Sequence, residues 1–260
     1  MIPTDQILIW RASAPWLDAD FVEQDLVLSR ALVEIFSSTA ADQLALRGGT
    51  SLHKVVLDKP ARYSEDIDLV YTAAQPIGTV LDGIRTHLDP WLGKPKRKFK
   101  DMLVTLTYRF QAETGAPMRL KIEINQREKK NLHGFVERHF EVSSPWFSGA
   151  ADIRTYSTEE LLGTKLRALY QRKKGRDLFD IWITHQQAGF DADKVVGCFR
   201  HYLAGQGLTI SQAEFTQNLD AKLSDTDFDA DVLPLLPDRG AAYDQEAAAA
   251  IVRDKLLTRL

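Results

Sequence analysis

The sequence predicts an α+β, bilobed protein: a lobe of mixed strands and helices over residues 1–155 and a mostly helical lobe over residues 156–260. Short apolar strand patterns alternate with amphipathic helical patterns in the first part of the chain. After Tyr156 the apolar spacing becomes helical. The length of 260 residues allows one large domain or two modest ones.

In the first lobe, apolar residues spaced by three and four predict an amphipathic helix over residues 21–37. A short apolar strand over residues 44–47 ends at a glycine pair, and a helix is expected over residues 51–57. The other elements expected in this lobe are a strand over 67–71, a helix over 77–92, and strands over 102–110 and 118–125.

The last of these strands alternates between apolar and polar residues. Leu120, Ile122 and Ile124 occupy one set of positions, so the period of two places Glu123 on the polar face together with Lys121 and Asn125. In the second lobe, Ser157 and Glu160 have the spacing of a capping box that begins a helix. A break at Gly175 precedes another helix, and helices are expected for much of the remainder.

Hydrophobic residues make up 44% and charged residues 27% of the chain, which is typical of a soluble globular protein. No apolar run approaches the roughly 18 residues of a membrane span, and the first residues lack a secretion signal pattern. The single Cys198 excludes an internal disulfide and a cysteine metal cluster. A cytoplasmic protein without membrane contact is expected.

The net charge of −3 argues against a uniformly basic nucleic-acid binder, but the charge is unevenly distributed. Basic clusters occur at residues 94–100, 127–130 and 172–176, and acidic residues gather at 225–231. The nearly neutral total can therefore conceal a positive surface beside a negative one.

The turn at Gly48-Gly49-Thr50-Ser51 can bind a phosphate group. Glycines permit positive φ and let a phosphate approach the backbone, while hydroxyls and the free N–H groups of a following helix donate hydrogen bonds. The alternative is an ordinary strand-to-helix turn with a Thr or Ser cap.

Asp66 and Asp68 are two residues apart on an expected strand, so both side chains leave the same face. Two adjacent carboxylates on an apolar strand are costly to bury unless a cation neutralises them. Magnesium binds one or two carboxylates together with phosphate oxygens, and the preceding Gly-Gly turn favours such a site. The alternative is a solvated strand edge.

Glu123 is a candidate third carboxylate, which could complete the metal site or accept the proton of an attacking hydroxyl. The alternative is a cross-strand ion pair with Lys121 or another surface residue. Lys165 lies beside the buried stripe of its helix, where a lysine must either extend to solvent or find an anion such as a triphosphate.

Asp177 and Asp180 have helical spacing and should share one face. They could cap their helix and pair with Arg172 or Arg176, or they could orient Lys165 or Arg176 toward a nucleotide. The pattern alone leaves both possibilities open.

Four separated motifs occur in order: Gly48-Gly49-Thr50-Ser51-Leu52, Arg62-x-Ser64-x-Asp66-Ile67-Asp68-Leu69, Lys165-Leu166-x-Ala168-Leu169 and Arg176-Asp177-x-x-Asp180-Ile181. Over residues 25–185 the chain resembles the AbiEii family, the nucleotidyltransferase toxins of bacterial abortive-infection and toxin–antitoxin systems within the polymerase-β-like superfamily. The resemblance implies a nucleotidyltransferase-like mixed sheet with flanking helices, facing a helical lobe.

The resemblance also implies Mg2+ as cofactor and a nucleoside triphosphate (NTP) as substrate. A nucleotide would pass to an RNA end, with the tRNA 3′ acceptor end as the expected acceptor and a block of translation as the result. A separately encoded antitoxin would oppose the toxin. By motif, Asp66 and Asp68 match the metal-binding pair, and Lys165 with Asp177 or Asp180 matches the later catalytic positions.

The residues expected to bind the nucleotide are Gly48, Gly49, Thr50, Ser51, Lys54, Arg62 and Ser64. Catalysis would rest on positioning and electrostatics as pyrophosphate leaves. The basic clusters at 94–100 and 172–176 would contact RNA phosphates without reading the sequence, or would simply be solvated loops.

Three other functions remain open. A metal-dependent nuclease also needs carboxylates and a lysine, but its Glu-x-Lys order is reversed here in Lys121-Ile122-Glu123, and it needs no Gly-Gly turn. A non-catalytic nucleotide-binding module is disfavoured because all the candidate carboxylates are present. Nucleotidyl transfer to a protein or small molecule keeps the same chemistry, although the basic clusters favour RNA.

Overall fold

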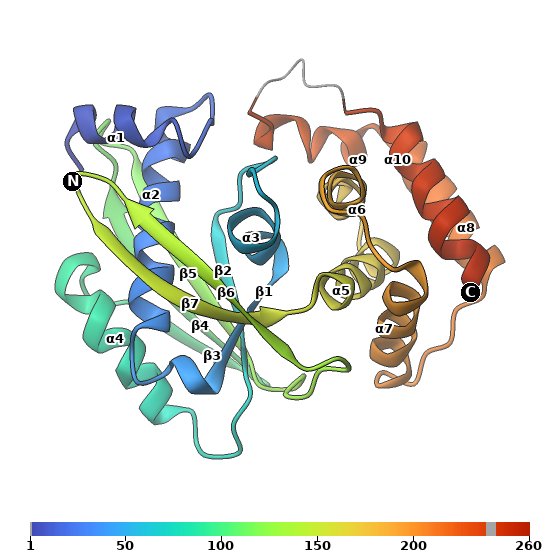
Figure 1. Cartoon of the computed structure of the whole chain (residues 1–260), viewed down its shortest axis with the longest axis horizontal. Helices are drawn as coiled ribbons and strands as arrows, with labels where there is room; N and C mark the ends of the chain where they lie inside the picture. Colours follow the sequence, from blue (N-terminus) through green and yellow to red (C-terminus); the bar gives the residue numbers. More distant parts are fainter. Residues whose placement is uncertain (1, 238–242) are drawn as a thin grey trace. The chain divides into compact units, whose positions relative to one another are not determined.

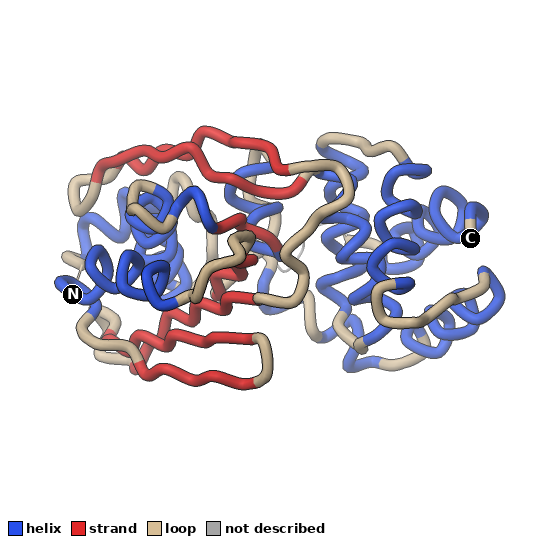
Figure 2. The backbone as a smooth tube through the Cα atoms, turned by 90° about the horizontal axis from the view of Figure 1, so that it is seen from below, coloured by secondary structure: helices blue, strands red, loops and turns tan. Residues whose placement is uncertain are grey.

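The computed structural model describes residues 2–237 and 243–260. The chain divides into two compact units. The first unit comprises Met1–Val56, Tyr63–Asn131 and Phe135–Tyr156, and the second comprises Leu57–Arg62, Leu132–Gly134 and Ser157–Leu260. All the strands of the described residues belong to the first unit, whereas the second is built from helices and loops (Figure 2).

The first unit contains one seven-stranded mixed sheet with the order β3-β4-β5-β2-β1-β7-β6. Two neighbouring pairs, β2 with β5 and β1 with β7, are parallel, and the other four pairs are antiparallel. The strands are β1 (Leu44–Arg47), β2 (Asp66–Tyr71), β3 (Lys96–Lys100), β4 (Leu103–Gln111), β5 (Pro117–Asn125), β6 (Phe135–Ser143) and β7 (Ser148–Tyr156).

Two long helices of the first unit, α2 (Ala19–Phe36) and α4 (Gly78–Leu92), pack against the sheet and against each other (Figure 1). Alternate side chains of β4 and β5 are fully buried and form the core beneath them: Val104, Leu106, Leu120, Ile122 and Ile124. The remaining α-helices are α1 (Thr4–Trp10) and the short α3 (Gly48–Ser51), which continues as one π-helical turn over Leu52–Val56. A 3-10 turn over Ala41–Gln43 precedes β1.

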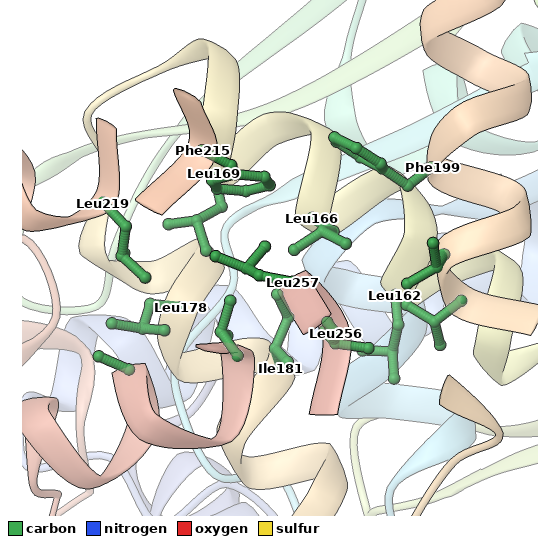
Figure 3. Close-up of a cluster of buried hydrophobic side chains, with 14 of the residues drawn as sticks. Leu162, Leu166, Leu169, Leu178, Ile181, Phe199, Phe215, Leu219, Leu256 and Leu257 are labelled. Atoms are coloured by element: carbon green, nitrogen blue, oxygen red, sulfur yellow. The ribbon is translucent and has the colours of Figure 1, made fainter. Parts of the chain in front are cut away.

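The second unit has six α-helices in its described residues: α5 (Thr158–Gln171), α6 (Gly175–Gln187), α7 (Ala192–Ala204), α8 (Gln212–Leu223), α9 (Thr226–Ala230) and α10 (Gln245–Ile251). Leucine and phenylalanine side chains from α5 to α8 and from the C-terminal turns meet in one buried cluster (Figure 3). Leu162 and Leu166 of α5, Ile181 of α6 and Phe199 of α7 belong to this core. No helix among the described residues is both long and apolar enough to span a bilayer.

The strands and helices predicted from apolar periodicity are present, and with one exception their boundaries lie within two residues of the prediction. The helix after the glycine pair already begins at Gly48, three residues earlier than expected. The strand β3 and the hairpin of β6 and β7 were not predicted. Every residue of β3 is exposed and most of β6 is exposed or half-buried, so neither has the period-two pattern that identifies a strand.

The expected capping box at α5 is half right. Ser157 Oγ accepts a hydrogen bond from Glu160 N at 3.3 Å. The Glu160 carboxylate, however, accepts hydrogen bonds from Leu132 N (2.6 Å), His133 N (3.1 Å) and the Tyr202 hydroxyl (2.6 Å). It therefore holds the segment 132–134 within the second unit instead of closing the cap.

Candidate active site

The glycine turn and the carboxylate strand lie in direct contact. Arg47, the last residue of β1, pairs with Asp68 across the antiparallel strands β1 and β2. The next residue, Gly48, has a φ of +77°, and a Cβ there would lie 2.5 Å from Asp68 Oδ2. Only glycine has both the conformation and the space for this turn. The expected proximity of the turn and the paired acids is therefore present.

The two aspartates share their face of the sheet with two residues of β5. Asp66 pairs in register with Lys121, and Asp68 pairs with Glu123. Lys121 Nζ lies 2.6 Å from Asp66 Oδ2 and 3.6 Å from Glu123 Oε1. The polar-face position predicted for Glu123 is confirmed. Its ion pair with Lys121, the alternative to a catalytic role, also forms, but within β5 and not across two strands, and Asp66 is the closer partner of that lysine.

Burial raises the pKa of Asp66 to about 6, and the hydrogen bond and charge of Lys121 offset this only in part. Burial alone would lower the pKa of Lys121, but Asp66, Glu123 and Asp68 hold it above its ordinary value. The ammonium of Lys121 thus places a positive charge beside the carboxylates of Asp66 and Glu123.

Within residues 2–237 and 243–260, no three acidic, histidine or cysteine side chains are grouped so that they could hold one metal ion. Mg2+ usually binds through one or two carboxylates plus substrate phosphates and water. The pair Asp66 and Asp68 fits that requirement, whereas a cage of three protein ligands is not formed.

The hydroxyls of the turn are engaged within the protein. Thr50 Oγ1 donates to the Asp66 carbonyl oxygen at 2.5 Å and lies 2.9 Å from Ser64 Oγ. Ser51 Oγ lies 2.6 Å from Thr155 Oγ1, and both side chains are buried. These bonds fasten the turn to β2 and β7. The group that the turn can offer a phosphate is the start of α3, whose first N–H groups receive no side-chain cap from Arg47.

Two cations expected at the phosphates lie in buried ion pairs, which differs from the sequence expectation. The Lys54 ammonium pairs with Asp25, which also accepts hydrogen bonds from Trp10 Nε1 (2.8 Å) and Trp16 Nε1 (3.0 Å). Arg62 belongs to the second unit and is buried. Its Nε and Nη2 donate to the two carboxylate oxygens of Asp180 at 2.6 and 2.7 Å.

The later motifs meet in the second unit. Lys165 Nζ lies 3.1 Å from Asp177 Oδ1 and 2.7 Å from Asp180 Oδ2, and both carboxylates are fully buried. Arg172 donates two hydrogen bonds to Asp177, at 2.7 and 2.8 Å. Pairing of Asp177 with Arg172 and contact with Lys165, which the sequence left as alternatives, therefore occur together.

The basic cluster at 172–176 is neutralised by the late acidic segment. Lys173 pairs with Asp225, and Lys174 and Arg176 pair with Asp231 at 3.1 and 2.8 Å. Although burial alone would raise it, the hydrogen bonds and charge of Arg176 hold the pKa of Asp231 well below its usual range.

The basic cluster at 94–100 is different. Its strand β3 is exposed along its whole length. Over the described ranges of the chain, no side chain forms an ion pair or hydrogen bond with Lys96, Arg97, Lys98 or Lys100.

The sequence did not identify Arg47 as a site residue. Its guanidinium pairs with Glu128. Burial alone would lower the pKa of Arg47, but Glu128, Tyr156 and Asp68 hold it above the ordinary value. An arginine at the end of an apolar strand, directly before the glycine pair, was the available signal.

The fold of this chain is similar to that of solved structures, one of which is a nucleotidyltransferase toxin. MenT4, a nucleotidyltransferase toxin from Mycobacterium tuberculosis, aligns with a TM-score of 0.57 and 15% identity over 98% of this chain and 100% of its own. JHP933 from Helicobacter pylori aligns with a TM-score of 0.55 and 17% identity over 94% of each chain. These likenesses establish the fold.

A match between the sequence and a family model establishes the family. The model of the family described as "Nucleotidyl transferase AbiEii toxin, Type IV TA system" matches residues 30–251, and the chain belongs to this family. Among curated proteins, none matches the sequence. The predicted fold class and the family resemblance are thus both confirmed.

Proposed function

We propose that this protein is a magnesium-dependent toxin that transfers a nucleotide from an NTP to an RNA acceptor, the tRNA 3′ end, and thereby blocks translation. A cognate antitoxin would oppose it. The observation that supports the proposal best is the contact between the Gly48 turn and Asp68, because it places phosphate-binding backbone next to a metal-binding carboxylate.

Asp66 and Asp68 are the proposed ligands of Mg2+, together with oxygens of the triphosphate. When bound, the ion would neutralise charge on the reacting phosphates. The N–H groups at the start of α3 would hold the phosphates, while Thr50 and Ser64 keep the turn against β2. Glu123 is the proposed acceptor of the proton of the attacking hydroxyl, since no group of three carboxylates that could share the metal ion occurs among the described residues.

Lys165, Asp177 and Asp180 remain the proposed catalytic residues of the later family motifs. For Arg62 we propose a positioning role in place of phosphate binding. Its guanidinium fixes the carboxylate of Asp180, and that carboxylate fixes the ammonium of Lys165.

The test is a transfer assay with purified protein, bacterial tRNA and each radiolabelled NTP in turn. Wild-type protein should extend the tRNA with one preferred NTP, and Asp68→Asn should not. Asp152→Asn is the matched control, because Asp152 is an exposed carboxylate on β7 that pairs with His139. RNA shortened without NTP would support the nuclease instead, and label on a protein would support a protein acceptor.

A further inference from the structure

The polar face of the sheet continues from the carboxylates to the edge strand β3. Side chains of residues paired in register point to the same face of a sheet. One row of such pairs runs through Asp68, Glu123, Thr105 and Lys98, and the next runs through Asp66, Lys121, Thr107 and Lys96. Lys96 and Lys98 therefore share a face with the two aspartates.

Three strand spacings separate β2 from β3, a distance of roughly 14 Å at about 4.8 Å per spacing. Thr105 and Thr107 lie between, and neither β3 nor β4 contains an acidic residue. A polyanion that approaches the aspartates from the β3 edge would thus meet the lysines of β3 and the hydroxyls of β4 before it reaches Lys121 and Glu123 of β5.

The basic clusters at 94–100 and 172–176 differ in how their charges are compensated. Lys173, Lys174 and Arg176 are paired with Asp225 or Asp231. The lysines of β3 have no such partner among the described residues. Because binding of nucleic acid depends on cations that can replace the counterions of phosphates, β3 is the better suited of the two.

We propose that Lys96, Lys98 and Lys100 bind the sugar-phosphate backbone of single-stranded acceptor RNA next to the end that is extended. This inference rests on the proposed function and names the surface along which the acceptor enters the site. Such contacts fix the position of the RNA and carry no sequence preference. Lysines on an edge strand also discourage pairing with another sheet edge, and the test includes that outcome.

The test measures affinity for a 5′-fluorescein single-stranded RNA oligonucleotide by anisotropy, with full-length protein, no NTP and a series of salt concentrations. Each phosphate contact contributes a slope of about −0.7 in log K against log salt, so its loss weakens binding roughly fourfold at 0.15 M salt. The triple variant Lys96→Gln, Lys98→Gln, Lys100→Gln should bind roughly 50-fold more weakly, with a slope shallower by about 2.

The matched controls are single variants on the same strand. Lys98→Gln should weaken binding, and Arg97→Gln should not, because Arg97 alternates to the opposite face. Unchanged RNA affinity in the triple variant would overturn the inference. If that variant also aggregates, the lysines protect the sheet edge and do not bind RNA. Asp68→Asn separates the two proposals, because it should abolish transfer and keep RNA affinity. If the wild-type protein binds RNA through these lysines but transfers no nucleotide, the proposed function is wrong and the RNA-binding inference stands.

Discussion

Substitution of Asp180 by asparagine tests the buried ion network of the second unit. Asp180→Asn keeps the shape of the side chain and removes its charge. Arg62 and Lys165, whose side chains are only 3% and 8% exposed, would then lose a carboxylate at 2.6 and 2.7 Å. Arginine does not deprotonate in proteins, so its charge stays in the interior without that partner.

The expected cost can be estimated from the structure. Removal of one partner from a buried ion pair destabilises a protein by about 3–5 kcal/mol. Lys165 retains Asp177 at 3.1 Å, which favours the lower end, about 3 kcal/mol. The second unit has slightly more than 100 residues, and for that size such a loss lowers its melting temperature by about 12 °C.

The assay is thermal unfolding followed by circular dichroism at neutral pH. Asp225→Asn is the control, because Asp225 pairs with exposed Lys173 and asparagine caps a helix as well as aspartate does. The control variant should have the same melting temperature as the wild-type protein. If Asp180→Asn also melts with the wild type, the buried charges do not depend on Asp180 and the reasoning fails.

Three further predictions concern single residues. Gly48→Ala should lower both the melting temperature and nucleotidyl transfer, since its Cβ would meet Asp68. Gly93 has a similar φ of +74°, but a Cβ there would have no atom within 4 Å, so Gly93→Ala should lower only the melting temperature. Equal effects of the two variants on transfer would refute this. Lys121→Met removes the ammonium between the carboxylates, so Mg2+ should raise the melting temperature of the variant more than that of the wild type; an equal rise would contradict the role given to the lysine. Burial lowers the pKa of Lys222 to about 8, so the folded state binds fewer protons than the unfolded state above that pH. Urea unfolding should therefore show stability rising from pH 8 toward about 10.4, and a Lys222→Met variant with the same rise would disprove the assignment.

Local periodicity made much of the fold predictable from the sequence. In β4 and β5 one face is buried and the other is not, so the alternation of apolar residues identified both strands. In β3 all five residues are exposed, and the pattern that a buried face imposes is missing. Only the pairing with β4 in the structure shows that these residues form the edge strand of the sheet.

The parts of the site in which a sequence motif determines backbone geometry were predictable. The ion-pair partners of the side chains were less so. The contact of Gly48 with Asp68 follows from two motifs on adjacent strands. The partner of Arg62 lies 118 residues further along the chain. Lys54 pairs with a residue 29 positions earlier. Adjacency to a motif could not reveal either interaction, because both depend on tertiary packing.

Calorimetric titration of a non-hydrolysable NTP, with and without Mg2+, tests most directly whether the glycine turn and the aspartates form one binding site. The wild-type protein should bind the nucleotide only when Mg2+ is present, and Asp66→Asn and Asp68→Asn should each lose that binding while Asp152→Asn keeps it. Equal binding by all four proteins, or binding that ignores Mg2+, would contradict the assignment of this site.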